Sequence, residues 1–155
     1  MTFLPAAATI IIGLSLVYAC FTDIRERVIS NTTVLIVTLA AAAHLLWQYH
    51  VGTIPFSQVA GAAALAVGIL AVGVLAVESG QIGGGDVKLL AGLSLLTGLA
   101  YAVELLIATG LAGGLLSIGM MMVRRGANTP PVYVPYGFAI SVGGFWIIAR
   151  IWGFI

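Results

Sequence analysis

The feature that most constrains the fold is a succession of long apolar stretches separated by short polar segments. A helix needs about 20 apolar residues to cross the hydrocarbon core of a bilayer. Only 7% of the residues are charged, whereas soluble domains carry about 25%, so the chain cannot cover a water-facing surface. Backbone groups in lipid must be hydrogen-bonded internally, and the apolar stretches show no alternation of period two. The sequence therefore predicts an all-α, polytopic membrane helical bundle and argues against a β-barrel.

Six membrane spans are predicted in one integral-membrane domain over residues 1–155. The apolar run from Val87 to Val123 is too long for one span, because such a helix would measure about 55 Å against a hydrocarbon core of about 30 Å. We therefore expect a turn at 97–101, and a polar loop at 124–131 precedes the last span. The predicted spans are 3–21, 33–47, 56–77, 87–98, 102–123 and 134–152.

The basic residues predict the orientation of the bundle. Five of the six fall in alternate loops, on one side of the predicted bundle. These are Arg25, Arg27, Lys88, Arg124 and Arg125. Loops rich in Lys and Arg face the cytoplasm, and the opposite side holds only Arg150. We therefore expect both termini outside, and Asp23 and Asp86 together at the cytoplasmic face.

Acidic residues at membrane depth are costly and become candidates for function. Asp23 closes the first span, and Asp86 follows the glycine run Gly83, Gly84 and Gly85. A structural role is the alternative: Asp23 as a solvated loop residue beside basic side chains, and Asp86 as a helix N-cap. Three consecutive glycines are entropically costly for a simple cap. They would let a neighbouring helix or an extended substrate approach the backbone closely.

Paired carboxyl groups can hydrolyse a peptide bond, since an ionised one removes a proton from water while a protonated one polarises the carbonyl. Such chemistry requires no metal or cofactor, and none is expected in a chain with Cys20 as its single cysteine. The dipoles of their own helices favour an anion on Asp86, near an N-terminus, and disfavour one on Asp23, near a C-terminus. This predicts Asp86 as the resting base and Asp23 as the proton carrier.

Three segments resemble the type IV prepilin peptidases, a family of intramembrane aspartyl proteases. Residues 83–89 (GGGDVKL) are similar to its GxGD motif, and residues 23–31 (DIRERVISN) are similar to the motif around its first aspartate. Residues 134–140 (VPYGFAI) resemble the start of its last span. The resemblance covers nearly the whole chain in order and spacing.

This resemblance implies an endopeptidase of the inner (cytoplasmic) membrane that removes the short leader of prepilins or pseudopilins at the cytoplasmic face. It assigns catalysis to Asp23 and Asp86. Supporting or substrate-binding roles would fall to Gly83, Gly84, Gly85, Lys88, Asn31 and Tyr136. The expected partners are a prepilin, with its leader and hydrophobic helix, and the lipid bilayer. The net charge of +1 and the absence of a basic patch give no support for a nucleic-acid partner.

Two departures from the family pattern refine this expectation. Larger members carry an N-terminal segment with paired cysteines and also N-methylate the mature pilin, so methylation is not expected here. The chain instead resembles the short form that serves tight-adherence (Flp) pili, or the similar archaeal preflagellin peptidase. In the first motif, Ser30 stands where proline is common, which is expected to loosen the turn into the second span.

Two other functions remain open at this stage. A small ion- or proton-coupled transporter could use Asp23 and Asp86 as carriers, although transporters usually place such acids near the midplane and show repeat symmetry. A non-catalytic membrane subunit of a secretion system would use the glycines for packing alone. Among the other polar residues, Glu104 and His44 are expected to serve packing, and Glu78 to be a solvated helix end.

Overall fold

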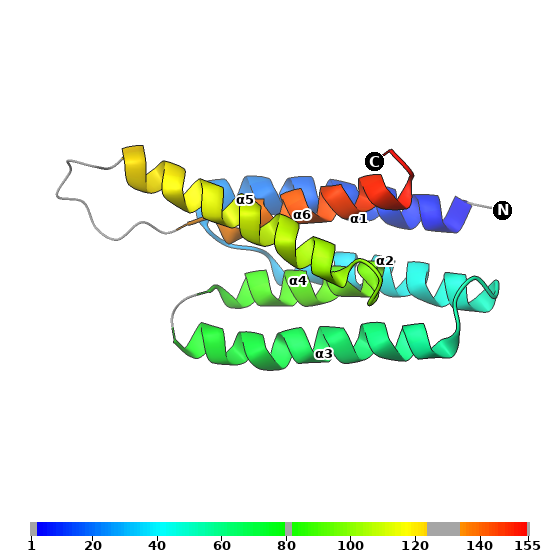
Figure 1. Ribbon diagram of the computed structural model, residues 1–155. Helices are drawn as coiled ribbons and strands as arrows, with labels where there is room; N and C mark the ends of the chain where they lie inside the picture. Colours follow the sequence, from blue (N-terminus) through cyan, green and yellow to red (C-terminus); the bar gives the residue numbers. More distant parts are fainter. Residues whose placement is uncertain (1–2, 80–81, 124–133, 155) are drawn as a thin grey trace.

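The computed structural model describes residues 3–79, 82–123 and 134–154, and within these ranges the only regular elements are helices (Figure 1). They are α1 (Phe3–Glu26), α2 (Asn31–His50), α3 (Phe56–Glu78), α4 (Gly84–Thr97), α5 (Ala102–Val123) and α6 (Tyr136–Ile151). The predicted all-α class is confirmed.

Successive helices run in opposite directions and form two layers (Figure 1). One layer contains α1, α5 and α6, and the other contains α2, α3 and α4. Contacts between α1 and α2 and between α4 and α6 join the two layers. The C-terminal ends of α1, α3 and α5 consequently lie at the same end of the bundle as the N-terminal ends of α2, α4 and α6.

The short helix α4 is the centre of the core. It packs on α2, α3, α5 and α6, and Leu89 and Leu93 are completely buried. They pack into one apolar cluster with Leu16 of α1, Val37 of α2 and Ile147 of α6. Helix α4 is thus enclosed on most sides, whereas α3 and α5 carry most of their apolar side chains on the outside of the bundle.

Four helices, α1, α2, α3 and α5, are long and apolar enough to cross a membrane, and α6 is a shorter apolar helix. The chain is therefore a membrane protein. The predicted turn at 97–101 is confirmed: α4 ends at Thr97, α5 begins at Ala102, and Gly98 has a positive φ of 54° that favours glycine. The number of membrane crossings and the side of each terminus stay predictions. The predicted loop at 124–131, with Arg124 and Arg125, lies outside the described residues.

Several helix ends differ from the predicted span ends, and two of these differences lie beside Asp23 and Asp86. Helix α1 continues through the polar residues to Glu26, so the segment after 21 is a further helical turn and not a loop. Helix α4 begins at Gly84, inside the glycine run. Glycine destabilises the interior of a helix because it loses much conformational entropy there, and these glycines lie instead at the first turn.

Ser30 does not loosen the turn between α1 and α2. It is the N-cap of α2, and its hydroxyl accepts a hydrogen bond from the amide of Thr33 at 3.1 Å. Serine is among the preferred N-cap residues because this bond satisfies an otherwise unpaired amide. Ser30 therefore defines the start of α2 through this hydrogen bond, where a proline would define it by restricting the backbone.

Gly92 allows α4 to approach α2 closely. A Cβ atom at this position would lie 3.4 Å from Cβ and 3.5 Å from Cα of Thr38, and would overlap the Thr38 hydroxyl. That hydroxyl is held by a 2.8 Å hydrogen bond to the carbonyl of Val34. Small residues at helix interfaces are a main source of stability in membranes, where packing replaces the hydrophobic effect.

We therefore expect Gly92→Leu to lower the free energy of unfolding by about 1–3 kcal/mol, the usual cost of overpacking. The measurement is a thermal or denaturant melt in detergent micelles. Gly119→Leu is the matched control, because a Cβ at Gly119 of α5 would meet no atom within 4 Å. Equal melting behaviour of the two variants would contradict the proposed α2–α4 packing.

Candidate active site

The carboxylate of Asp23 is buried against the N-terminus of α6. The side chain is only 2% exposed, and its Oδ2 accepts a 2.7 Å hydrogen bond from the backbone amide of Gly137. The amide of Phe138 is a second donor to the same carboxyl. Helix N-termini present unpaired amides and bind anions well. Asp23 is therefore not the solvated loop residue of the structural alternative.

Gly137 is required for this contact. A Cβ atom on it would lie 2.8 Å from Oδ2 and 3.0 Å from Cβ of Asp23, and 2.9 Å from Cδ1 of Ile29. Only a residue without a side chain lets the α6 backbone come this close to the carboxylate.

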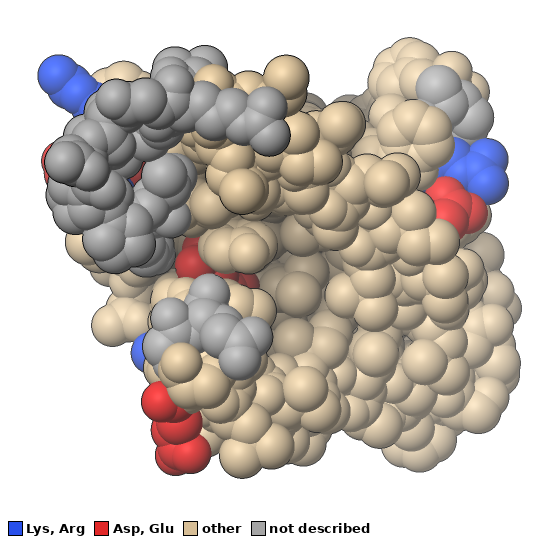
Figure 2. All heavy atoms as spheres, turned by 60° about the vertical axis from the view of Figure 1, so that its left-hand side comes forward, with Lys and Arg blue, Asp and Glu red and all other residues tan. Residues whose placement is uncertain are grey.

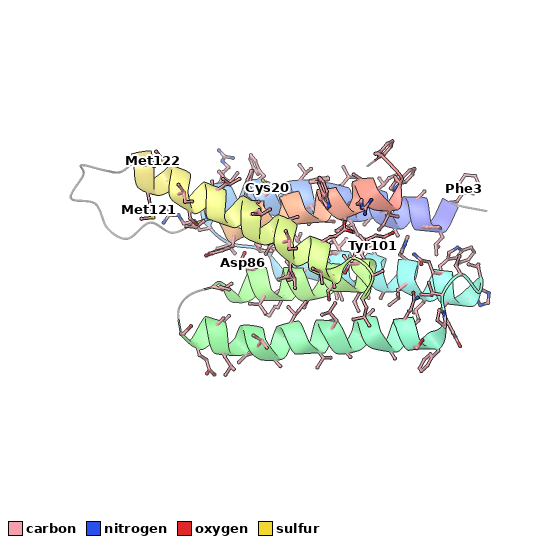
Figure 3. All side chains as sticks on the ribbon, in the orientation of Figure 1. Phe3, Cys20, Asp86, Tyr101, Met121 and Met122 are labelled. Carbon is pink, nitrogen blue, oxygen red and sulfur yellow. The ribbon has the colours of Figure 1, made fainter. Side chains whose placement is uncertain are left out.

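Asp86 approaches from the other layer of the bundle. It is the third residue of α4 and is 4% exposed, and it lies where α4 faces the layer of α1, α5 and α6 (Figure 3). The N-cap is Gly83, whose amide donates a hydrogen bond back to the Asp86 carboxyl. A carboxyl at this helix position commonly reaches back to the N-cap amide.

One oxygen of Asp86 has no partner. Its Oδ1 is buried and makes no hydrogen bond with any described residue. A buried carboxyl oxygen without a partner is costly, so a capping role explains only half of this side chain. Asp86 lines an apolar groove of about 910 Å³ between α3 and α5, and Tyr136 lines it as well.

The two carboxyl groups lie close enough to interact electrostatically. They come from α1 and α4, whose relevant ends meet at one end of the bundle. Figure 2 views this end and shows acidic atoms recessed in a hollow. Two adjacent buried carboxyl groups cannot both ionise easily and tend to share a proton. This arrangement can supply a base and an acid to a molecule bound between them.

The predicted supporting residues surround the pair in different ways. Gly85 packs tightly, since a Cβ there would lie 3.2 Å from the carbonyl oxygen of Ile29, whereas a Cβ at Gly84 would meet nothing within 4 Å. The amine of Lys88 donates a 3.2 Å hydrogen bond to Oδ1 of Asn31. This bond joins the start of α4 to the start of α2, on the exposed side of the site.

The other ionisable residues lie apart from the carboxyl pair. Glu104 is in the first turn of α5, at the opposite end of the bundle, where Arg150 donates to it at 3.1 Å. His44 is buried and hydrogen-bonded to Gln48, and Glu78 is an exposed helix end. These three positions agree with the predicted structural roles. Among the described residues, no three His, Cys, Asp or Glu side chains gather as metal ligands would.

Gly137 and the amide of Phe138 are the parts of the site that sequence reasoning missed. The segment 134–140 was recognised only as similar to the start of a family span. The sequence from Pro135 to Gly137 could have indicated an anion-binding helix start. Pro135 is the N-cap of α6, and a glycine in the first turn leaves the backbone amides accessible to an anion.

The fold and the site together define a helical membrane protein with two buried, neighbouring carboxyl groups beside an apolar groove. The sequence model of the type IV leader peptidase family matches residues 10–118, and the chain belongs to this family. The match includes Asp23 and Asp86 and ends before α6. Comparison with curated proteins and with solved structures gives no match. The predicted family is thus confirmed, and the chain belongs to a family of proteases.

We expect Gly137→Ala to lower peptidase activity by about 100-fold, because a displacement of a catalytic group by about 1 Å can have this effect. The added methyl group would push the Asp23 carboxylate away from the α6 amides. Activity is measured as cleavage of a leader-bearing substrate by purified protein in detergent. Gly13→Ala is the control, since its Cβ would meet Phe145 at an ordinary 3.6 Å. Equal activity of both variants would show that the contact is unimportant.

Proposed function

We propose that this protein is an aspartyl endopeptidase that cleaves the short leader of type IV prepilins or pseudopilins at the cytoplasmic face of the inner membrane. The observation that carries the proposal is the convergence of Asp23 and Asp86, buried side by side at one end of the bundle. Membership of the leader peptidase family supports the reaction. Within this family, the proposed substrates are those of the Flp pili or of the similar archaeal preflagellin system.

The hydrogen bonds around the carboxyl groups favour different roles from those that helix dipoles alone predict. Two amides of α6 donate to Asp23, and charge-assisted bonds of this kind stabilise an ionised carboxylate. Asp86 receives the Gly83 amide and keeps a bare, buried Oδ1. A proton on this oxygen removes the cost of a buried charge. We therefore assign the base to Asp23 and the acid to Asp86.

The reaction then follows the usual course for paired carboxyl groups. Asp23 removes a proton from a water molecule, whose oxygen attacks the carbonyl carbon of the scissile bond. Asp86 gives its proton to the carbonyl oxygen, forming a tetrahedral diol. When the C–N bond breaks, Asp23 returns its proton to the leaving amine and a hydroxyl proton of the diol restores Asp86.

The supporting residues position this pair. Gly83 orients Asp86 through its amide, and Gly85 brings α4 against the α1–α2 turn. The Lys88–Asn31 bond holds the same turn from the exposed side. Gly84, with open space around it, is available to the backbone of an extended leader. Tyr136 lines the groove beside Asp86 and is suited to contact the substrate there.

A transporter or a non-catalytic subunit is less well supported. Asp23 is in the last turn of α1 and Asp86 in the first turn of α4, and these helix ends lie at the same end of the bundle (Figure 1). Coupled transporters usually bind their ions near the midplane. In a purely structural subunit, the buried Oδ1 of Asp86 without a hydrogen bond would only lower stability.

We expect Asp23→Asn and Asp86→Asn each to lower leader cleavage by about 10²–10⁴-fold, the usual contribution of acid–base groups. The variants are co-expressed with a prepilin whose leader ends in glycine, and the size shift of the prepilin is followed on gels. Glu104→Gln is the matched control, because Glu104 is acidic but remote from the pair. Cleavage that survives in either aspartate variant, with the protein still in the membrane, would refute the proposal.

The proposed topology has six crossings, with both termini outside and the carboxyl pair at the cytoplasmic end. An alkaline phosphatase fused after residue 155 should be active, because this enzyme folds only outside the cytoplasm. The same reporter inserted between residues 79 and 82 should be inactive. The opposite pattern would invert the topology and place Asp23 and Asp86 on the outer face.

A further inference from the structure

The two outermost helices of the bundle leave a groove between them. Helices α3 and α5 do not pack on each other. Their common neighbour α4 forms the floor together with α6, which packs on α4 and α5. The groove has a volume of about 910 Å³ and an almost entirely apolar lining. Figure 2 shows the hollow along this face, with acidic atoms recessed in it.

Both walls of the groove contain glycines among their apolar side chains. Gly68 on α3 and Gly110 and Gly114 on α5 line it, and a Cβ atom on any of them would meet nothing within 4 Å. Elsewhere in the bundle, neighbouring atoms occupy the space where a Cβ of Gly92, Gly137 or Gly144 would lie. The open glycines therefore face space that the chain itself does not fill. Glycine surfaces in lipid let a second helix approach closely.

The length of the groove suits a helix. Its wall on α3 extends from Ala64 to Ala76, which is about 18 Å, or about three helical turns. Both walls belong to helices of membrane-spanning length and hydropathy. An occupant therefore lies within the apolar layer and has to be apolar itself.

The lining of the groove includes a buried carboxyl group with one oxygen that makes no hydrogen bond to any described residue. This group belongs to Asp86, which is only 4% exposed, and the oxygen is its Oδ1. A lipid chain filling the groove would leave this oxygen unsatisfied. A peptide carbonyl beside a protonated Oδ1 would satisfy it, so the occupant combines an apolar helix with an exposed backbone at one end.

We propose that the α3–α5 groove docks the apolar helix of the peptide substrate and holds the adjoining scissile bond at Asp86. This inference rests on the proposed peptidase function and adds where the non-reacting part of the substrate binds. Binding energy gained along the groove would be used to position the scissile bond between the two carboxyl groups. Substrates would then be selected by their membrane helix as well as by their leader.

The first test fills the groove from each wall. Gly68→Leu and Gly110→Leu should each lower cleavage of a full-length, leader-bearing prepilin by about tenfold or more, because the new side chains occupy the space of the docked helix. Gly119→Leu, on α5 but outside the groove and with equally open surroundings, should cleave like the unmodified protein. Thermal melts of all three variants control for folding.

The second test detects the docked helix directly. In a Cys20→Ser, Asp23→Asn background, a cysteine at Gly68 or Gly110 should form a disulfide with a cysteine in the second or third turn of the prepilin helix. A cysteine at Gly119 should not. The proposal is overturned if the groove cysteines cross-link only to a second copy of this chain, or if they give no more prepilin adduct than Gly119→Cys.

The outcomes separate this inference from the proposed function. If Asp23→Asn and Asp86→Asn abolish cleavage while Gly68→Leu and Gly110→Leu cleave normally, the protein is a peptidase but the groove is not its docking site. If the aspartate variants still cleave, the catalytic assignment itself fails.

Discussion

The arrangement of this site depends on the contact between the N-terminus of α6 and the carboxylate of Asp23. A hydrogen bond of 2.7 Å joins residues that are 114 positions apart in the chain. It requires the bare backbone of Gly137, and it fixes the C-terminal end of α1 against the start of α6. The α1–α2 turn takes its place beside the same contact through Ile29, and α4 follows because Gly85 packs on that turn. One buried carboxylate thus organises the ends of four helices.

The central helix α4 connects this end of the bundle to its core. Leu89 and Leu93 are fully buried and leave Asp86 little freedom to move away from Asp23. A catalytic group held by a rigid, well-packed element is positioned more accurately than one on a loop. By contrast, α3 and α5 bury little of their surface, so the parts of the bundle that a substrate would meet are also those least constrained by the fold.

Much of this structure could be predicted from local features of the sequence. Long apolar runs define the helices, the excessive length from Val87 to Val123 requires the turn at Gly98, and alternating basic loops place Asp23 and Asp86 at one end. The predicted proton assignment used only the helix to which each carboxyl belongs. It omitted α6, because nothing in the sequence states that Gly137 meets Asp23. The α3–α5 groove was equally inaccessible, since it arises from two helices that fail to touch.

The shortness of α4 has a consequence for the supply of water. Its 14 residues measure about 21 Å, whereas the hydrocarbon core is about 30 Å thick. Helix α4 is enclosed by longer helices, and its N-terminal end is set back from the adjacent ends of α3 and α5 (Figure 1). In the proposed topology this leaves a recess at Asp86 that cytoplasmic water can enter. Hydrolysis consumes one water molecule per bond, yet the two carboxyl groups lie in a protein that is surrounded by lipid. The shortness of one central helix would let the enzyme take that reactant from the cytoplasm without a channel through the membrane.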